Sequence, residues 1–415
     1  MVLRFQASPP PRSGPPPPAD GRRAPEAVAL ATLILKRGAE RRIRSGHPWI
    51  YRGEVADIKG AWAAASAVEV TESTGRYLGR GFYSPRSSLV CRLLTRADEP
   101  VDAALFHRRL EAAREYRRAA GLAGPAYRLC WSEADGLPGL VVDRYGPVSV
   151  VQCLTLGMAR VADWVREALD RLFPGDPMQR LDDLTAARIE GFEPVRETYE
   201  TELIVEEGPA RFAVSLGAGQ KTGLYLDQRD NRLLVAGLAQ GRRMLDAFCY
   251  AGGFACQALL AGASSALLVD SSADALEAAR GNLARNGLAG RAFVGAGNAF
   301  DALRELEARG ERFGLVVLDP PPFTRRKDAV EAALRGYKEI NLRGLRLLER
   351  GGLLATFSCS HHVTPALFED ICRQAAGDAG VRVRIRATLT QSRDHPVLLT
   401  VPETHYLTGL LLELT

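Results

Sequence analysis

The residues best suited to covalent chemistry stand near the C-terminus, in LLATFSCSHH (residues 353–362). Cys359 ends an apolar, strand-like run there and is flanked by serines and histidines. A lone thiol in a core strand is usually a small buried hydrophobe, but these polar neighbours favour a nucleophile. A thiolate adds well to carbon 6 of cytosine, and the addition makes carbon 5 reactive enough to take a methyl group. Cys359 is therefore the candidate nucleophile of a cytosine-C5 methylation.

A rigid motif precedes it in the chain. VVLDPPPF (residues 316–323) places Asp319 directly after an apolar run and before three prolines that fix the backbone. The motif could be no more than a stiff loop. Alternatively, Asp319 holds a base flipped out of the RNA while Phe323 stacks on it. We take Asp319 as the catalytic partner of Cys359, and the acceptor of the carbon 5 proton is unassigned.

Further strand ends carry residues that suit a nucleoside with a charged tail. LDAFCYAGGF (residues 245–254) contains Asp246 and two glycines, ALLVD ends at Asp270, and Asn298 follows the next apolar run. Singly, these residues could be a tight turn and helix caps. The glycines lack the GxGxxG spacing of a dinucleotide site. Together, glycines for close approach, a carboxylate for ribose hydroxyls and an amide for adenine predict S-adenosylmethionine as cofactor.

A doubly wound, mostly parallel sheet would bring all these residues to one edge. From about Phe212 onward, short apolar runs alternate with helix-length segments, which is the pattern of such a sheet. Ligands bind outside the carboxyl ends of its strands. We therefore predict a Rossmann-like α/β domain over residues 207–415, with the cofactor and Cys359 at one rim.

Upstream of this domain the pattern changes twice. Residues 1–28 are rich in proline and predict a disordered tail. Residues 29–101 hold short β-rich runs between Gly, Pro and Ser turns, which favour a small β-barrel. Residues 102–206 open with a helix and continue with strands, which indicates a mixed α/β unit. The predicted fold class is α/β with a separate N-terminal barrel.

Composition limits the remaining classes of protein. The 415 residues are 46% hydrophobic and 25% charged, enough for several cores. No run approaches the roughly 20 apolar residues of a membrane span, and no secretion signal is evident, so we expect a cytoplasmic protein. Seven cysteines without CxxC pairs suggest neither zinc nor disulfides. The net charge of +5 suits a polyanion, although the arginine bias could reflect a GC-rich gene.

A basic cluster interleaved with aromatic residues occupies residues 36–52. Cations there could contact RNA phosphates while rings stack on bases, and the alternative is a solvated basic face. The residues that we expect to contact RNA are Lys36, Arg37, Arg41, Arg42, Arg44 and Trp49, with Phe323 at the flipped base.

These motifs resemble those of the bacterial large-subunit ribosomal RNA cytosine-C5 methyltransferases of the RlmI type. The resemblance runs from about Leu33 to the C-terminus. It includes SGHPWIYRGEV (45–55), SEADGLPGLVVDRYG (132–146), KTGLYLDQRDNR (221–232), FCYAGGFA (248–255), LDPPPF, RGYKEIN (335–341), FSCSHH and DHPV (394–397). It implies a PUA RNA-binding barrel, a linking α/β domain and a class I methyltransferase domain that acts on 23S ribosomal RNA.

The resemblance also implies which residues bind the cofactor. They are Tyr225, Asp227, Gln228, Arg229, Asp246, Phe248, Gly252, Asp270, Asn298 and Asp319. Asn298 stands where the family more often has an acidic residue, which puts affinity in question. The Asp319 motif lacks the second cysteine of two-cysteine enzymes, so product release must use another base. No metal or membrane is implied, and both a monomer and a homodimer stay open.

Two competing functions remain. A DPP motif followed by an aromatic residue also serves exocyclic amines such as guanine N2, and that chemistry needs no thiol. A non-catalytic ribosome-assembly factor could keep a methyltransferase-like domain, although the intact cofactor and thiol positions argue against it. In the DHP tripeptide, Asp394 and His395 are candidates for closing the substrate pocket.

Overall fold

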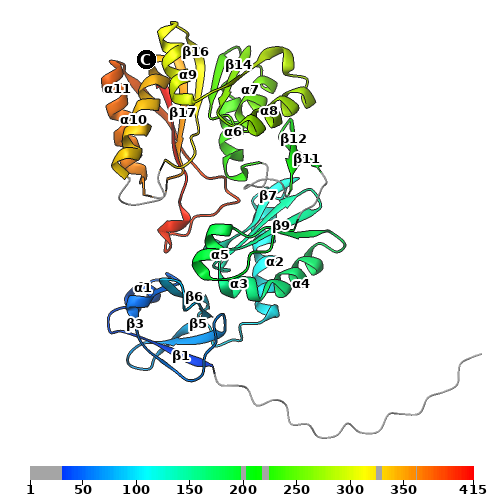
Figure 1. The fold of residues 1–415 in the computed structure, drawn as a ribbon, viewed down its shortest axis with the longest axis vertical. Coiled ribbons are helices and arrows are strands. Elements are labelled where there is room, and N and C mark those ends of the chain that lie inside the picture. Colours follow the sequence, from blue (N-terminus) through cyan, green and yellow to red (C-terminus); the bar gives the residue numbers. More distant parts are fainter. Residues whose placement is uncertain (1–29, 198–201, 217–223, 324–329, 361) are drawn as a thin grey trace, which may run out of the picture.

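The computed structural model describes residues 30–415 except 198–201, 217–223, 324–329 and 361. The predicted tail over 1–28 lies outside this part. Three units follow one another along the long axis, with the N-terminal unit and the C-terminal unit at opposite ends (Figure 1). Within the described ranges, no helix is both long and apolar enough to cross a membrane.

The N-terminal unit is a curled mixed sheet. Its described strands have the order β2-β6-β5-β4-β1-β3, in which β1 runs parallel to β4. Alternating burial along β1 places Leu33 and Leu35 in the core, as expected for a sheet with one covered face. The elements are β1 Ala31–Leu35, α1 Glu40–Arg44, β2 Trp49–Tyr51, β3 Val55–Lys59, β4 Ala67–Thr71, β5 Tyr77–Tyr83 and β6 Leu89–Thr95.

The central unit packs helices on a second sheet of order β10-β9-β8-β7. Its first helix begins as predicted, because the Asp102 carboxylate accepts a hydrogen bond from the Leu105 amide and caps it. The elements are α2 Ala103–Ala119, β7 Ala126–Trp131, β8 Leu140–Tyr145, β9 Val148–Cys153, α3 Leu156–Arg160, α4 Ala162–Leu172, β10 Met178–Arg180 and α5 Leu184–Glu190.

A hairpin of β11 Glu202–Glu207 and β12 Ala210–Ser215 follows. Its second strand packs on α8 (Ala273–Arg285) of the C-terminal unit, where Asn282 Oδ1 accepts from the Ala213 amide at 2.9 Å. The predicted boundary between residues 206 and 207 therefore falls inside one hairpin. Sequence periodicity missed this, because the short strands carry Glu and Arg on their exposed face.

The C-terminal unit contains the predicted doubly wound sheet. Its described order is β15-β14-β13-β16-β17-β19-β18, parallel except for β19. The elements are α6 Arg229–Ala236, β13 Arg243–Ala247, α7 Gly253–Leu260, β14 Ser265–Asp270, α8 Ala273–Arg285, β15 Ala292–Ala296, α9 Ala299–Ala308, β16 Phe313–Leu318, α10 Val330–Arg346, β17 Leu348–Ser358, α11 Pro365–Ala379, β18 Val383–Thr390 and β19 Thr408–Leu414. The chain order reverses between β13 and β16, which opens a crevice at their carboxyl ends.

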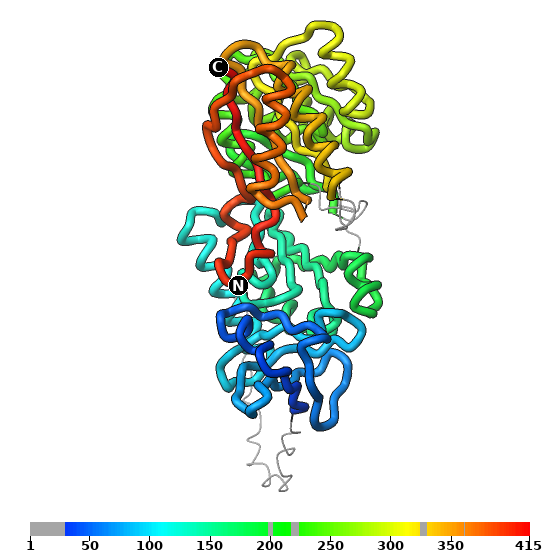
Figure 2. Tube along the Cα trace, turned by 90° about the vertical axis from the view of Figure 1, so that its left-hand side faces the viewer, coloured from blue at the N-terminus to red at the C-terminus, as the bar shows by residue number. Residues whose placement is uncertain are grey.

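One connection leaves this sheet. Between β18 and β19, residues 391–407 run away from the sheet to the central and N-terminal units (Figure 2). At the far end, Glu403 Oε2 lies 3.1 Å from His47 Nε2 of the N-terminal unit. We call this segment the excursion.

Candidate active site

A cavity of about 800 Å³ opens at the carboxyl ends of β13, β14, β16 and β17. Its volume is in the range of small-molecule sites. Most of the residues predicted from the sequence line it, namely Tyr225, Asp227, Gln228, Phe248, Asp270, Asn298, Asp319, Phe323 and Cys359. Asp246, Gly252 and Arg229 are not among the lining residues.

The loop after β13 has an unusual backbone. Phe248 (φ 63°) and Tyr250 (φ 47°) adopt the left-handed region, and Gly252 (φ 74°) follows. This region costs an ordinary side chain about 1–3 kcal/mol and tends to occur at functional sites. A Cβ on Gly252 would lie 3.1 Å from the Leu268 side chain, so glycine is also required by space. The strained turn presents Phe248 and Tyr250 to the cavity, which residue types alone did not reveal.

Asp270 is not a helix cap, which was its alternative explanation. Ser272 caps α8 by accepting from the Ala275 amide. Asp270 Oδ1 accepts from the amide of Ser272 at 2.9 Å, and Oδ2 accepts from the Tyr250 amide at 2.9 Å, so Asp270 ties the strained loop to the start of α8. Asn298 does cap α9, through a 2.8 Å bond from the Phe300 amide to Oδ1. Both side chains still line the cavity.

Asp246 lies beneath the loop and is only 1% exposed. Its Oδ2 accepts a 3.1 Å hydrogen bond from the Ala255 amide. Burial, with a smaller contribution from Asp319 and Asp270, raises the pKa of this carboxyl to about 8. Asp246 therefore tends to keep its proton near neutral pH and supports the loop from below.

Cys359 differs from the other thiols. It is partly exposed, while the other six cysteines are buried and none is in a disulfide. Its Sγ lies 3.7 Å from the carbonyl oxygen of Pro320, beside Asp319. Cys249 also lines the cavity, but burial raises the pKa of its thiol far above the usual value. Of the two cavity thiols, Cys359 is the better placed to react.

Asp319 and Phe323 have defined partners. Asp319 Oδ1 accepts a 3.0 Å hydrogen bond from Gln228 Nε2. The Phe323 ring lies 4.5 Å from the Tyr337 ring, centroid to centroid, and 5.6 Å from that of Phe300. Phe323 thus belongs to an aromatic cluster at the cavity wall, and Tyr337 limits how its ring can turn.

Asp227 is held by a residue that the sequence did not single out. The Tyr406 hydroxyl donates to Asp227 Oδ2 at 2.6 Å, across 179 residues. Burial, reinforced by Asp227, raises the pKa of Tyr406 well above its usual value, so the hydroxyl keeps its proton and donates. Asp227 Oδ1 is buried and has no hydrogen-bond partner among the described residues. Such an atom is costly unless a ligand supplies a donor.

The charge of the cavity fits a cationic ligand. Four carboxylates line it, those of Asp227, Asp270, Asp274 and Asp319. Among the described lining residues, Arg232 is the one arginine or lysine, and its Nε donates to buried Glu207 at 2.7 Å. This excess of negative charge suits the sulfonium and ammonium of S-adenosylmethionine and disfavours a phosphate. The described residues contain no cluster of His, Cys, Asp or Glu arranged for a metal.

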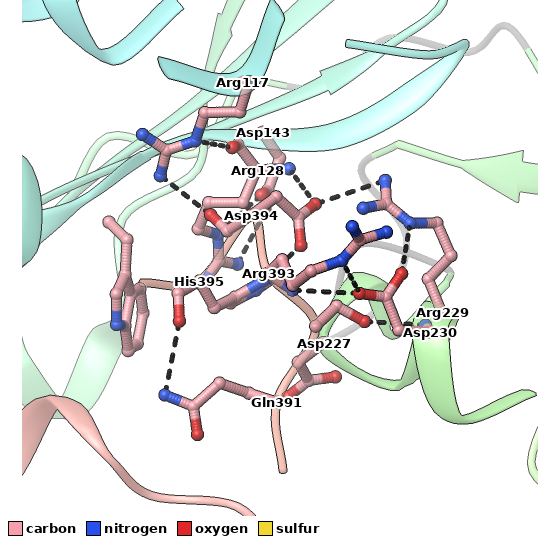
Figure 3. A network of polar contacts seen from close by, with 12 residues as sticks. Arg117, Arg128, Asp143, Asp227, Arg229, Asp230, Gln391, Arg393, Asp394 and His395 are labelled. Atoms are coloured by element: carbon pink, nitrogen blue, oxygen red, sulfur yellow. Dashed lines mark hydrogen bonds and ion pairs between the residues drawn. The ribbon is translucent and has the colours of Figure 1, made fainter. Parts of the chain in front are cut away.

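The DHP tripeptide and Arg229 lie elsewhere. Asp394 accepts from the Arg128 amide at 2.9 Å, and its carbonyl accepts from Arg117 at 2.7 Å (Figure 3). Arg229 Nη1 lies 3.4 Å from Asp394 Oδ2. The expectation that Asp394 and His395 close the substrate pocket is therefore corrected, because both are buried at the junction between the excursion and the central unit.

The N-terminal basic cluster is partly engaged within the protein. Arg42 contacts Glu54 at 2.8 Å, Arg44 Nε donates to Glu72 at 2.7 Å, and Lys36 donates to the Gly53 carbonyl. Trp49 Nε1 donates to Glu133 of the central unit at 2.8 Å. Arg37 and Arg41 are exposed, and no hydrogen bond or ion pair joins their side chains to any described residue.

Family models match two regions of the chain. Residues 33–96 match a PUA-like domain, and residues 188–386 match an S-adenosylmethionine-dependent methyltransferase. The predicted fold class is thereby confirmed. S-adenosylmethionine is the cofactor of the C-terminal unit.

Relatives match over nearly the whole length. "Ribosomal RNA large subunit methyltransferase I" of Shewanella denitrificans is 40% identical over 91% of this chain and 98% of its own. The proteins of that name from Alteromonas mediterranea and Escherichia coli are each 38% identical, over 93% and 91% of this chain and 99% and 98% of their own. A methyltransferase structure solved with SAH superimposes with a TM-score of 0.80 at 18% identity, covering 92% of this chain and 99% of its own. The chain therefore belongs to the ribosomal RNA large subunit methyltransferase I family.

Proposed function

We propose that the protein methylates carbon 5 of a cytosine in large-subunit (23S) ribosomal RNA, with Cys359 as covalent nucleophile. The observation that carries this proposal is the exposure of one thiol, Cys359, in the wall of a cavity that Asp319 and Phe323 also line. The names of the full-length relatives support large-subunit ribosomal RNA as the substrate. They leave the reacting atom open, and the thiol argues for carbon 5.

The chemistry follows from the placement of these side chains. The Cys359 thiolate adds to carbon 6, and the electron pair of the 5,6 double bond becomes available at carbon 5. S-adenosylmethionine would supply the electrophilic methyl group for carbon 5, and the electron pair of the broken methyl–sulfur bond would stay on its sulfur as S-adenosylhomocysteine. A base then removes the carbon 5 proton, and the returning electron pair expels the thiolate. Asp319 holds the ring by accepting from its 4-amino group, and Phe323 lies against the flipped base.

In this proposal, residues of the cavity wall hold the cofactor. Asp270 accepts from the ribose hydroxyls, Asn298 faces the adenine edge, and Asp227 Oδ1 accepts from the ammonium group. Tyr225 and Phe248 pack against the cofactor, while Asp246 and Gly252 shape the loop from behind. Arg229 has no contact role in this proposal, since it pairs with Asp394.

RNA capture is assigned to the N-terminal unit. Within the basic cluster over residues 36–52, Arg37 and Arg41 are exposed and have no side-chain hydrogen bond or ion pair with any described residue, whereas Arg42 and Arg44 pair with carboxylates and Lys36 with a carbonyl. In this division a PUA-like unit over 29–101 binds RNA, residues 102–206 link, and residues 207–415 carry out methyl transfer.

Replacing the thiol tests the mechanism. Cys359→Ala should reduce methyl transfer to 23S ribosomal RNA by at least about 1,000-fold, because carbon 5 then lacks the thiolate that activates it. The Kd for S-adenosylmethionine, measured by calorimetry, should change by less than about threefold, which corresponds to less than about 1 kcal/mol of binding free energy. Cys372→Ala is the matched control, because this thiol is buried on α11 away from the cavity.

The outcomes separate the alternatives. Full activity of Cys359→Ala would disprove the carbon 5 mechanism and favour an exocyclic amine such as guanine N2. Failure of the unmodified protein to bind S-adenosylmethionine would favour a non-catalytic assembly factor. Bisulfite mapping of ribosomal RNA from cells lacking the protein would locate the cytosine.

A further inference from the structure

We infer that Gln228 and Asn231 form a hydrogen-bonded chain that orients the Asp319 carboxylate, so that Gln228 is a positioning residue for the base-binding group. The inference deepens the proposed function and rests on it for the role of Asp319. It changes the role that the family resemblance implied for Gln228, which was contact with the cofactor.

The chain runs from a strand end to the catalytic carboxylate. Asn231 Nδ2 donates to the carbonyl of Thr390 at 2.9 Å and to Gln228 Oε1 at 2.7 Å. Gln228 Nε2 then donates to Asp319 Oδ1 at 3.0 Å. Gln228 and Asn231 are 3% and 4% exposed, so water cannot easily replace either partner.

Both ends of the chain accept hydrogen bonds, and this decides how the two amides point. The Thr390 carbonyl cannot donate, so Asn231 must present its nitrogen to it. The same nitrogen carries a second hydrogen, which reaches Gln228, so Gln228 must present its oxygen on that side. Its nitrogen therefore faces Asp319. Turning either amide over would set two oxygens against each other, so the donor to Asp319 is dictated by a residue on another strand.

Hydrogen bonds from residues next to Thr390 fix the anchor of this chain. Thr390 ends β18, and the next segment holds the backbone around Gln228 from the other side. The Ser392 amide donates to the Asp227 carbonyl at 2.7 Å, and Ser392 Oγ accepts from the Asp230 amide at 2.8 Å. The orientation of Asp319 is thus set by the end of β18 as well as by its own proline turn.

A neutral donor suits these surroundings. The charged and titratable groups that face this site are Tyr225 and Asp227 on the same segment, Arg232 on α6, Asp246 on β13, Asp319 after β16 and Cys359 after β17. An amide fixes one oxygen of Asp319 without adding charge. A carboxylate has about four acceptor positions, so Asp319 keeps capacity for the 4-amino group of cytosine.

The decisive variant is Gln228→Glu, which keeps the shape and changes the donor into a titrating group. Two carboxyls about 3 Å apart cannot both ionise easily, so the pair shares one proton at low pH and imitates the native hydrogen bond. This raises the pKa of the pair. The proton is present below that pKa and lost above it, so activity relative to the unmodified protein should fall at least about tenfold between pH 6 and pH 9. Because the activity of the variant is divided by that of the unmodified protein at each pH, the ionisation of Cys359, which both proteins share, cancels.

Two further variants keep the test decisive if the first folds poorly. Gln228→Met removes the donor without adding a titrating group, so kcat should fall about 10- to 100-fold at every pH. Asn231→Asp cannot donate to Gln228, which should then turn its amide and present oxygen to Asp319, with a similar loss in kcat. In both, the KM for S-adenosylmethionine should stay within about threefold. Asn341→Asp is the control, since Asn341 is equally buried, donates to the Tyr337 carbonyl and accepts from the Cys372 thiol on α11.

The outcomes distinguish this inference from the proposed function. A pH-independent activity ratio for Gln228→Glu, or a raised KM for S-adenosylmethionine at normal kcat, would overturn it and restore Gln228 as a cofactor contact. Mass spectrometry of the nucleoside made by the unmodified protein tests the proposed function separately. If that product is not 5-methylcytidine, the proposed function fails, while the activity ratios still report whether Gln228 orients Asp319.

Discussion

The cavity of the C-terminal unit and the junction beneath it both gather aspartates, but the partners of these carboxylates differ. At the junction these carboxylates pair with guanidinium groups, as in Asp394 with Arg229 and Asp143 with Arg128 (Figure 3). Asp135 pairs with Arg117 in the same way. In the cavity, backbone amides, Gln228 and Tyr406 donate hydrogen bonds to the carboxylates instead.

The pKa values record the same difference. At the junction, the hydrogen bond and charge of His395, with the charge of Arg229, outweigh burial and lower the pKa of Asp394 to about 2. In the cavity floor, burial dominates and raises the pKa of Asp246 to about 8. At the junction, where each of these carboxylates has a cationic partner, no ligand is needed to balance the negative charge. A region with excess negative charge is stabilised when a cation binds, which is what a methyl-donor site needs.

The largest expected effect is on methyl transfer, when the charge of Asp319 in the cavity is removed. Asp319→Asn should lower methyl transfer by about 100- to 1,000-fold, because the base loses its charged acceptor. The melting temperature should stay equal or rise, since the cavity loses one of several like charges. Thermal unfolding and initial rates measure the two effects. Asp301→Asn, an exposed position on α9, is the control, and a clear loss of stability in Asp319→Asn alone would contradict the description of the cavity.

The matching change at the junction should act on stability. Asp394→Asn removes the carboxylate charge that balances the partly buried Arg229 guanidinium. The free energy of unfolding should therefore fall by roughly 3 kcal/mol. Urea titration followed by tryptophan fluorescence measures this, and one of the four tryptophans, Trp131, lies at the junction with its ring 5.5 Å from that of His395. Affinity for S-adenosylmethionine should change less than about threefold in the folded protein. Asp98→Asn, in an exposed pair with Arg80, should cost no more than about 1 kcal/mol.

The two regions should also respond to pH in opposite directions. The folded pKa of Asp394 is depressed, so its contribution to stability is present above about pH 4 and lost as the pH falls toward about 2. The folded pKa of Asp246 is raised, so its contribution is fully present below about pH 4 and declines as the pH rises toward about 8. Asp246→Asn should therefore gain in melting temperature over the unmodified protein as the pH rises from 5 to 8. A constant difference would show that Asp246 is ionised in the fold.

The smallest change in stability and in cofactor affinity is expected at Tyr406, which connects the junction to the cavity. Tyr406→Phe removes the hydrogen bond to Asp227, which should cost about 1 kcal/mol of stability. It should weaken S-adenosylmethionine binding by less than about tenfold, measured by calorimetry, because Asp227 stays in place but loses its orientation. Tyr77→Phe, which breaks a hydroxyl bond to the Ala97 carbonyl, controls for loss of a hydroxyl. Equal affinity in both variants would mean that the junction does not influence the cofactor site.

The doubly wound sheet and the residues at its strand ends could be predicted, because strand and helix periodicities are local. Parallel strands that alternate with helices must gather their carboxyl ends at one edge. The hairpin over 202–215 was missed, since its strands are short and half exposed. Apolar residues in the excursion do not recur with the spacing of a helix or a strand, so the sequence did not predict its path. Its role as a contact between units depends on partners far away in the chain.

The sequence by itself determined which residue types stand at the rim, above all Asp270, Asp319 and Cys359. Only the tertiary structure decided that Arg229 belongs to the junction, that Tyr406 holds Asp227, and that Asn231 directs Gln228 toward Asp319. The reason is physical. Periodicity reports which face of an element is covered, but the partner of a buried polar group depends on long-range packing.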